Sequence, residues 1–428
     1  MQGYRGKALE LLDRCNAKVG DQVKIKLDDK SFEGILMPRY EFADDKHIVI
    51  KLSNGYNVGI DIDKINSIEV LESKVMKSAR KIEHKVRGDL PRIAMISTGG
   101  TIASKIDYRT GGVKAILSAE ELYNAVPELS NIANIEPEVL FNEYSENLTY
   151  EHWKAIAEKV YEKRDYDGII ITHGTDTMHY TASALSFALK INIPIVLVGA
   201  QRSSDRPSSD AATNLIAATL FASKTDLTGV FVAMHDNLSD NLISIHLGTR
   251  VRKCHTSRRD AFRSIGIKPI AYVKDGREII YNDRSLPKRG EVREYIKPSF
   301  AKVSLLKYYP SMDANIIKYL ADDSKGIVIE GTGLGHVGKT LFNAIEDAIN
   351  KNVIICMTSQ CIEGRVRMTV YETGRDLLRL GVIPLEDMLA ETAFTKLSWA
   401  LANYDHDQVK DIMLENISRE MNERSIIG

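Results

Sequence analysis

The sequence predicts an α/β protein in which a two-lobe, parallel-sheet core follows a small N-terminal β-barrel domain. Short strand-like runs fill the first part of the chain, apolar strands then alternate with helices, and a turn-rich segment precedes a second, shorter strand–helix series. The expected parts are a small β-barrel at 1–72, a basic linker at 73–90, a first α/β lobe at 91–264, a bridge at 265–310 and a smaller α/β lobe at 311–428.

The barrel is predicted from alternating hydrophobicity. Val23, Ile25 and Leu27 alternate with polar residues, and Asn54-Gly55 favours a tight hairpin. Five such runs with no helix between them are typical of a small β-barrel. Such a domain can bind a partner or RNA, or act as a plain spacer, and the residues leave these alternatives open.

The linker at 73–90 carries six Lys or Arg residues against two acidic ones, and Pro91 ends it. A basic run of this kind is usually a solvated face, and contact with nucleic acid is the alternative.

The core is predicted from continuous apolar strands between helices. The run Ile169-Ile170-Ile171 indicates a buried strand, and a helix is expected directly after it at 177–189. Ser118 and Glu121 form a capping box that predicts a helix to residue 126. Strands that are apolar on both faces indicate a parallel sheet covered by helices on both sides.

Composition excludes several classes of protein. The 428 residues are 44% hydrophobic and 27% charged, which excludes intrinsic disorder. A net charge of -1 gives no global field that would attract nucleic acid. Four cysteines cannot form a disulfide framework, so we expect reduced thiols. No apolar run reaches the length of a membrane span, and we expect a soluble, cytoplasmic protein without membrane contact.

Two motifs rich in Thr and Gly follow predicted strands of the first lobe. One is Thr-Gly-Gly-Thr-Ile-Ala at 98–103, and the other is Thr-His-Gly-Thr-Asp-Thr-Met at 172–178. Ligands of open α/β sheets bind at the carboxyl ends of the strands. Glycines let backbone N–H groups approach a ligand, and a threonine hydroxyl can act as a nucleophile beside a base. The two motifs together predict a catalytic site at this edge.

These motifs resemble the two signatures of the asparaginase-type amidohydrolases, over about residues 92–420. The N-terminal barrel and the segment Tyr-Ser-Glu-Asn-Leu-Thr at 144–149 make the sequence similar to one branch of that family, the GatD subunits of archaeal glutamyl-tRNA(Gln) amidotransferases. The resemblance implies an asparaginase-like two-lobe fold.

The resemblance also implies catalytic residues. Thr101 matches the primary nucleophile, and Tyr108 matches the tyrosine of a mobile lid. Thr175 and Asp176 match the second threonine and its neighbouring acid, and Lys253 matches the lysine that completes a Thr-Lys-Asp group. An ester on Thr101 would release ammonia before water cleaves it.

Substrate binding is implied at Ser145 and Glu146, which match the loop that holds the α-amino and α-carboxyl groups. Glu146 stands where plain asparaginases often carry glutamine, which departs from simple asparagine specificity. In the family, the C-terminal lobe of a second subunit closes the site, and His336 and Glu391 are candidates for that contribution.

The implied activity is hydrolysis of glutamine, with asparagine as a further substrate, to supply ammonia to a partner protein, GatE. GatE would bind tRNA(Gln) and convert Glu-tRNA(Gln) to Gln-tRNA(Gln) with ATP and Mg²⁺, so no cofactor is expected in this chain. A homodimer core within an α2β2 heterotetramer is expected. The alternatives are a free-standing L-asparaginase with an accessory N-terminal domain and a binding subunit whose amidase core is silent.

Two other functions, nucleotide hydrolysis and metal binding, match parts of the sequence less well than amide hydrolysis does. The segment 333–340 satisfies the P-loop pattern and follows a predicted strand, which would indicate an NTPase. No apolar strand ending in Asp is evident to hold Mg²⁺. His173 and His179 lack the spacing of a zinc pair, and Cys356 and Cys361 have no second Cys or His pair nearby.

Overall fold

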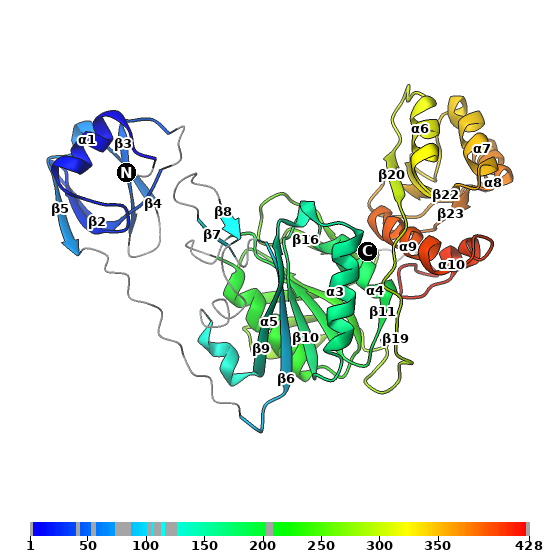
Figure 1. The fold of residues 1–428 in the computed structure, drawn as a ribbon, viewed down its shortest axis with the longest axis horizontal. Coiled ribbons are helices and arrows are strands. Elements are labelled where there is room, and N and C mark those ends of the chain that lie inside the picture. The colour runs from blue at the N-terminus through cyan, green and yellow to red at the C-terminus, as the bar shows by residue number, and fades with distance from the viewer. Residues whose placement is uncertain are drawn as a thin grey trace.

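The structure is a computed structural model with three parts in chain order: an N-terminal β domain, a large lobe and a smaller lobe (Figure 1). Most of the predicted linker and the predicted helix before residue 126 lie outside the described residues. In the described part of the chain, no helix combines the length and apolar character needed to cross a membrane. The described residues are 3–39, 43–52, 57–72, 87–100, 104–106, 113–115, 126–202 and 209–424.

The N-terminal domain is a five-stranded antiparallel sheet in the order β4-β3-β2-β1-β5. Val23 and Ile25 are fully buried, as their alternation predicts, and pack with Ala8 and Leu12 of helix α1. Helix α1 is an addition to the predicted barrel, and it covers the apolar face of the sheet. The elements are α1 (Gly6–Arg14), β1 (Gln22–Lys26), β2 (Ser31–Leu36), β3 (His47–Leu52), β4 (Asn57–Asp61), the short 3₁₀ helix η1 (Ile62–Lys64) and β5 (Ser67–Glu72).

The large lobe is built on an eight-stranded sheet in the order β18-β17-β14-β13-β12-β10-β6-β9. Strands β9, β6, β10, β12 and β13 are parallel, as predicted, whereas β14, β17 and β18 are antiparallel. The strands are β6 (Arg92–Gly99), β9 (Asn134–Glu143), β10 (Gly168–Thr172), β12 (Pro194–Val198), β13 (Gly229–His235), β14 (Leu242–Leu247), β17 (Ala271–Lys274) and β18 (Glu278–Tyr281).

The antiparallel strands correct two details of the prediction. The sheet is mixed rather than purely parallel, because β13 returns through a short connection into β14 and antiparallel neighbours need no crossover helix. The boundary expected at residue 264 also falls inside this lobe, since β17 and β18 belong to its sheet. Strand β18 alternates between exposed and half-buried residues at the sheet edge, so it lacks the continuous apolar run of a central strand.

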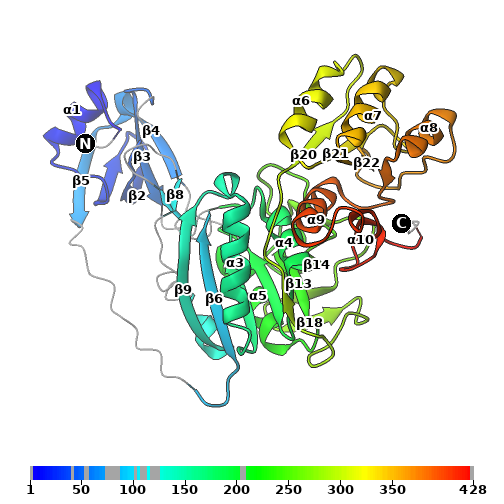
Figure 2. The same cartoon turned by 45° about the vertical axis from the view of Figure 1, so that its right-hand side comes forward.

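Helices cover both faces of the large sheet. Ile169 and Ile171 of β10 face the core under α3 and α4, and Ile170 faces the core under α5. Each buried isoleucine contributes about 1.5–3 kcal/mol relative to an exposed one. Figure 2 shows α3 running alongside β6 and β9. The helices are α3 (Tyr150–Glu162), α4 (Met178–Ala188) and α5 (Ala211–Lys224).

The strand order contains a topological switch point. Strand β6 pairs with β9 on one side and with β10 on the other, so the chain reverses its direction across the sheet between β9 and β10. A crevice is expected outside the carboxyl ends of the strands at such a point. Both Thr- and Gly-rich motifs begin there.

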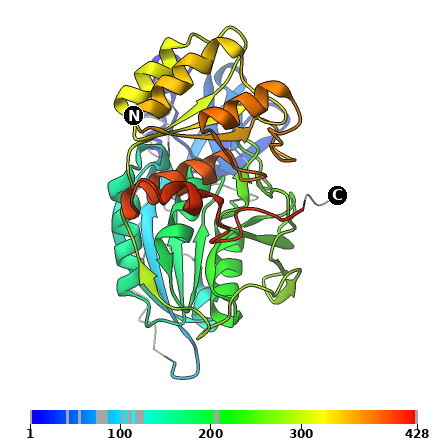
Figure 3. The ribbon, with the colours of Figure 1, turned by 90° about the vertical axis from the view of Figure 1, so that its right-hand side faces the viewer.

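The smaller lobe has a parallel sheet in the order β20-β21-β22-β23. Its core is shared with α6, α7 and α8, whereas α9 packs against both β21 and α4 of the large lobe. Figure 3 shows α9 lying between the lobes. The elements are β20 (Val303–Lys307), α6 (Asn315–Asp323), β21 (Gly326–Gly331), α7 (Phe342–Asn350), β22 (Ile354–Ser359), α8 (Glu372–Leu380), β23 (Ile383–Pro384), α9 (Ala390–Asn403) and α10 (Val409–Leu414).

Short elements complete the described structure. They are the 3₁₀ helices η3 (Pro127–Asn131), η4 (Ser145–Asn147) and η5 (Lys339–Leu341), and the paired strands β7 (Ser104–Ile106) with β8 (Val113–Ala115), β11 (Leu189–Lys190) with β19 (Tyr295–Ile296), and β15 (Val251–Lys253) with β16 (Phe262–Ser264).

The P-loop pattern adopts a different turn. The backbone N–H of Thr332 donates to His336 O at 2.8 Å, and the N–H groups of Gly335 and His336 both donate to Thr332 O at 3.0 Å. A phosphate cradle needs successive N–H groups pointing outward to an anion. Because two N–H groups of the pattern, those of Gly335 and His336, are used inside the turn, the geometry disfavours the nucleotide alternative.

A buried arginine joins the two lobes. The Arg250 side chain is 1% exposed and forms a 3.0 Å ion pair with Asp387. Its guanidinium also donates to the carbonyl oxygens of Asp387 and Glu420. The basic residues between 250 and 263 suggest surface salt bridges. Arg250, however, is buried and links the large lobe to the smaller one. Its five donors suit several acceptors at once, which is why arginine fills this position.

We predict that Asp387→Asn destabilises the protein by about 3 kcal/mol, because it leaves the buried Arg250 charge without a counter-ion. Urea unfolding would measure the loss. The matched control is Asp322→Asn, which removes an exposed ion pair with Lys351 and should cost no more than about 0.5 kcal/mol. Equal stability of the two variants would contradict the role of Arg250 as a link between the lobes.

Candidate active site

The site begins where β6 and β10 end side by side. The Thr98 hydroxyl donates to Thr172 O at 2.9 Å, which ties the two motifs together. Gly100 has a positive φ of 82°, and a Cβ atom there would lie 2.3 Å from Gly174 N. Only glycine permits this backbone conformation and this close approach. The glycines of both motifs therefore allow the strand ends to meet.

A third segment, η4, packs against the same point. A Cβ atom on Gly174 would lie 2.7 Å from Ser145 Cβ, so Ser145 is seated directly on the second motif. The Thr177 hydroxyl donates to Ser145 O at 2.6 Å and fixes the turn. Ser145 is buried, whereas Glu146 in the same turn is exposed. Thr177 belongs to the second motif, and this bond shows that it positions Ser145, a role that the sequence does not predict.

Lys253 unites the residues of the predicted Thr-Lys-Asp group. Its ammonium donates to Thr175 Oγ1 and to Asp176 Oδ1, each at 2.8 Å. The Lys253 side chain is 9% exposed and that of Asp176 is 67% exposed, so the group lies at the boundary between protein and solvent. A lysine amine that has lost its proton can accept one from the threonine hydroxyl over this distance.

The smaller lobe holds the strand that carries Lys253. Arg252 forms a 3.1 Å ion pair with Glu391 of α9, and the Thr392 hydroxyl donates to Thr249 O at 2.9 Å. These contacts lie on both sides of the buried Arg250. The position of Lys253 therefore depends on the smaller lobe of the same chain, a dependence that sequence spacing does not reveal.

The two candidates for closing the site lie elsewhere within this chain. Glu391 contacts Arg252 rather than the Thr-Lys-Asp group. His336 lies in the smaller lobe, where its ring packs edge-to-face on Tyr371 and its Nδ1 is 3.3 Å from the Thr373 hydroxyl.

His173 of the second motif and His179, which follows it, are buried and neutral at physiological pH. Burial lowers the pKa of His173 to about 4, and its Nδ1–H donates to Gly174 O at 2.7 Å. Burial, with Arg252 and Lys253 nearby, lowers the pKa of His179 to about 3. The described residues contain no group of three or more His, Cys, Asp or Glu side chains able to hold a metal ion.

Thr101 and Tyr108 lie outside the described residues. The site as described consists of Thr175, Asp176 and Lys253 beside Ser145. It offers a hydroxyl, an amine and a carboxylate in contact, next to backbone N–H groups at a glycine-rich strand end. This arrangement is suited to attack on a carbonyl carbon with proton transfer.

Comparison with known families divides the chain into three matched regions. Residues 17–71 match the GatD N-terminal domain, residues 92–286 match the N-terminal asparaginase domain, and residues 302–413 match the glutaminase/asparaginase C-terminal domain. The second match ends after β18, in agreement with the sheet of the large lobe.

Solved structures with the same core are asparaginases. The thermostable L-asparaginase from Thermococcus kodakarensis is 36% identical with a TM-score of 0.69, and the match covers 78% of this chain and all of that one. A probable cytoplasmic L-asparaginase from Campylobacter jejuni is 29% identical with a TM-score of 0.65, over 76% of this chain and 99% of that one. The predicted asparaginase-like fold is thus confirmed.

Curated relatives extend over the N-terminal domain as well. The GatD subunit of the glutamyl-tRNA(Gln) amidotransferase of Thermococcus kodakarensis is 49% identical over 97% of each chain. That of Pyrococcus furiosus is 49% identical over 96% of this chain and 97% of the relative. With nearly half of all residues shared along almost the whole length, the chain belongs to the GatD family of glutamyl-tRNA(Gln) amidotransferase subunits.

Proposed function

We propose that the chain is the amidohydrolase component of a glutamyl-tRNA(Gln) amidotransferase, which hydrolyses glutamine and supplies ammonia to its partner. The observation that carries this proposal is the contact of Lys253 with Thr175 and Asp176 at the switch point of the sheet. The match of residues 17–71 to the GatD N-terminal domain favours the tRNA-linked role over a free-standing asparaginase.

The proposed reaction has two steps. Thr101 Oγ bonds to the amide carbon of the substrate side chain, the C–N bond breaks, and the hydroxyl proton leaves with the nitrogen as ammonia. Water then adds to the ester carbon, and Thr101 is released with the free acid as product. Tyr108 assists the first step. Lys253, held by Asp176, exchanges a proton with the Thr175 hydroxyl during the reaction.

Substrate recognition is assigned to the turn that carries Ser145 and Glu146. Ser145 is fixed on the second motif by Gly174 and Thr177, so its backbone and hydroxyl lie beside the reacting groups. The exposed carboxylate of Glu146 can accept the α-ammonium group of glutamine.

The partner in this proposal is GatE, which would bind tRNA(Gln) and activate the glutamyl group of Glu-tRNA(Gln). ATP and Mg²⁺ would be used there, and this chain would carry no cofactor of its own. The proposed assembly is an α2β2 heterotetramer with a homodimer of this chain at its centre. The second candidate, a free L-asparaginase, rests on the solved asparaginase structures that share the core.

Ammonia release from glutamine and from asparagine distinguishes the two candidates. We predict strong glutamine hydrolysis only when the chain is mixed with GatE and Glu-tRNA(Gln), because the amidotransferase would couple ammonia release to its use. The measurement compares the chain alone with each partial mixture. Equal rates in every mixture, with asparagine preferred, would identify a free asparaginase.

A second prediction concerns the catalytic group. Thr101→Val should abolish ammonia release, and Thr175→Val or Lys253→Met should lower kcat about 10²- to 10⁴-fold by removing proton transfer. Matched controls are Thr340→Val and Lys339→Met in the exposed turn of the smaller lobe, which should leave kcat unchanged. A complex that still forms Gln-tRNA from glutamine after Thr101→Val would exclude Thr101 as the nucleophile.

A further inference from the structure

A cavity of about 360 Å³ lies at the opposite end of the central strands from the candidate active site. Its lining includes Ile195 near the start of β12, Gly229 at the start of β13 and Leu247 at the end of the antiparallel β14. The site described above lies at the carboxyl ends of β6 and β10. The cavity is therefore separate from that site, and its volume is within the range of small-molecule pockets.

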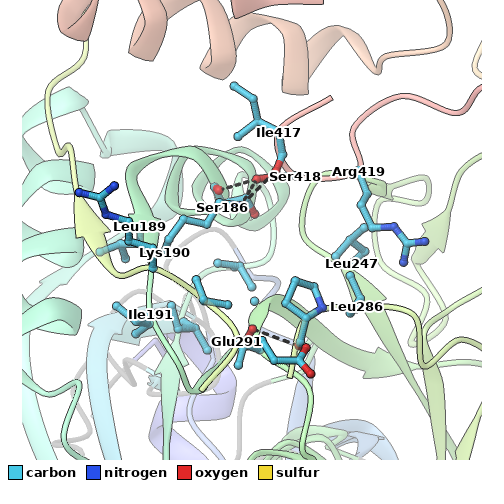
Figure 4. A pocket seen from close by; sticks show the side chains of 17 residues that line it. Ser186, Leu189, Lys190, Ile191, Leu247, Leu286, Glu291, Ile417, Ser418 and Arg419 are labelled. Atoms are coloured by element: carbon cyan, nitrogen blue, oxygen red, sulfur yellow. Dashed lines mark hydrogen bonds between the residues drawn. The ribbon is translucent and has the colours of Figure 1, made fainter. Parts of the chain in front are cut away.

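Segments from distant parts of the chain enclose the cavity. Figure 4 shows Ile417 and Ser418 on one side and Leu286 and Glu291 on the other. Most of the lining is apolar: Leu189, Ile191, Ile195, Val230, Leu247, Leu286, Pro287, Val292 and Ile417. Such walls suit the apolar body of an organic ligand.

Lys190 of β11 contributes one of the three positive charges of this lining, together with Arg293 and Arg419. Its ammonium donates to Ile417 O at 3.2 Å and to Ser418 Oγ at 2.8 Å, which are both neutral acceptors. Burial lowers the pKa of Lys190, and the Glu420 carboxylate, which pairs with Lys396, partly opposes this shift. An ammonium has three donors, so one remains for a ligand. A buried charge whose hydrogen-bond acceptors are neutral is unfavourable, and an anion bound to the ammonium would offset that cost.

Other charged groups of the lining determine which kind of anion can bind. Arg419 is engaged by Asp283 and by the Ser285 hydroxyl, at 2.9 and 2.8 Å. The exposed carboxylate of Glu291 adds a negative charge to the lining and would repel a second negative charge on a ligand. Arg293, the third cation of the lining, is exposed. The apolar walls favour a carboxylate with an apolar body over an inorganic phosphate, which has no apolar part.

The wall that carries Ser418 is held in place. The Ser418 hydroxyl donates to Ser186 O at 2.7 Å, and the Thr249 hydroxyl donates to Ser418 O at 2.8 Å. The Glu420 carboxylate accepts from the Ser418 backbone N–H at 2.6 Å and pairs with the buried Lys396. A fixed wall reduces the ordering cost of binding.

We propose that this cavity binds a small monocarboxylate with an apolar body. The carboxylate would pair with the Lys190 ammonium, and the body would lie against the apolar walls near Leu247 and Leu286. Binding in this cavity does not rest on the proposed reaction, because it can be measured without catalytic turnover.

The test uses hexanoate as the probe and isothermal titration calorimetry on the full chain. We expect hexanoate to bind with a dissociation constant of about 1 mM or lower. Its uncharged counterpart 1-hexanol should bind at least about tenfold more weakly, and Lys190→Gln should weaken hexanoate binding by a similar factor. Lys302→Gln, which changes an exposed lysine, is the matched control and should bind as the unaltered chain does.

Two further variants make the result decisive. Leu286→Trp fills the cavity and retains Lys190, so it should abolish binding even if Lys190→Gln does not fold. Lys253→Met alters the candidate active site and should leave hexanoate affinity unchanged. Failure of hexanoate to bind, equal affinity for 1-hexanol, binding that survives Leu286→Trp, or loss of binding in Lys253→Met would each overturn the proposal.

Discussion

The parallel pairing of β6 with β10 is the constraint on which the rest of the site depends. Their register places Ser97 opposite Thr172, so both strands end at one edge of the sheet. The motif that follows each strand must turn there, and the closeness of Gly100 to Gly174 leaves no room for a side chain between them. The meeting of the two motifs and the need for glycine between them are therefore consequences of this pairing.

The second constraint is the set of ion pairs through which the smaller lobe fixes the position of β15. Arg250 and Arg252 reach Asp387 and Glu391, and Lys253 follows directly. Helix α9 packs on α4 and on β21 at once, so its position relative to both sheets is fixed. The two asparaginase regions are thus one unit, because a group of the large lobe is positioned by contacts that the smaller lobe supplies.

Features with a local cause were predictable from the sequence. The strand at Ile169–Ile171 follows from its apolar run, and the burial of Val23 and Ile25 follows from their alternation. Features that depend on contacts between distant segments were not predictable from the sequence. The membership of β17 and β18 in the large sheet depends on their pairing with β14, and the burial of Arg250 depends on acceptors more than 130 residues away in the chain. The role predicted for Lys253 rests on family resemblance, since a lysine in a basic run has no local signal of catalysis.

The exposure of the Thr-Lys-Asp group has a physical consequence for the assembled enzyme. Asp176 is 67% exposed in the single chain, so water and salt screen its ion pair with Lys253. Any surface that covers Asp176 would remove this screening and strengthen the field at Thr175. A second copy of the chain that closes the site, as the family resemblance implies, would act in this way. The electrostatics of this group would then depend on the association of two copies of the chain.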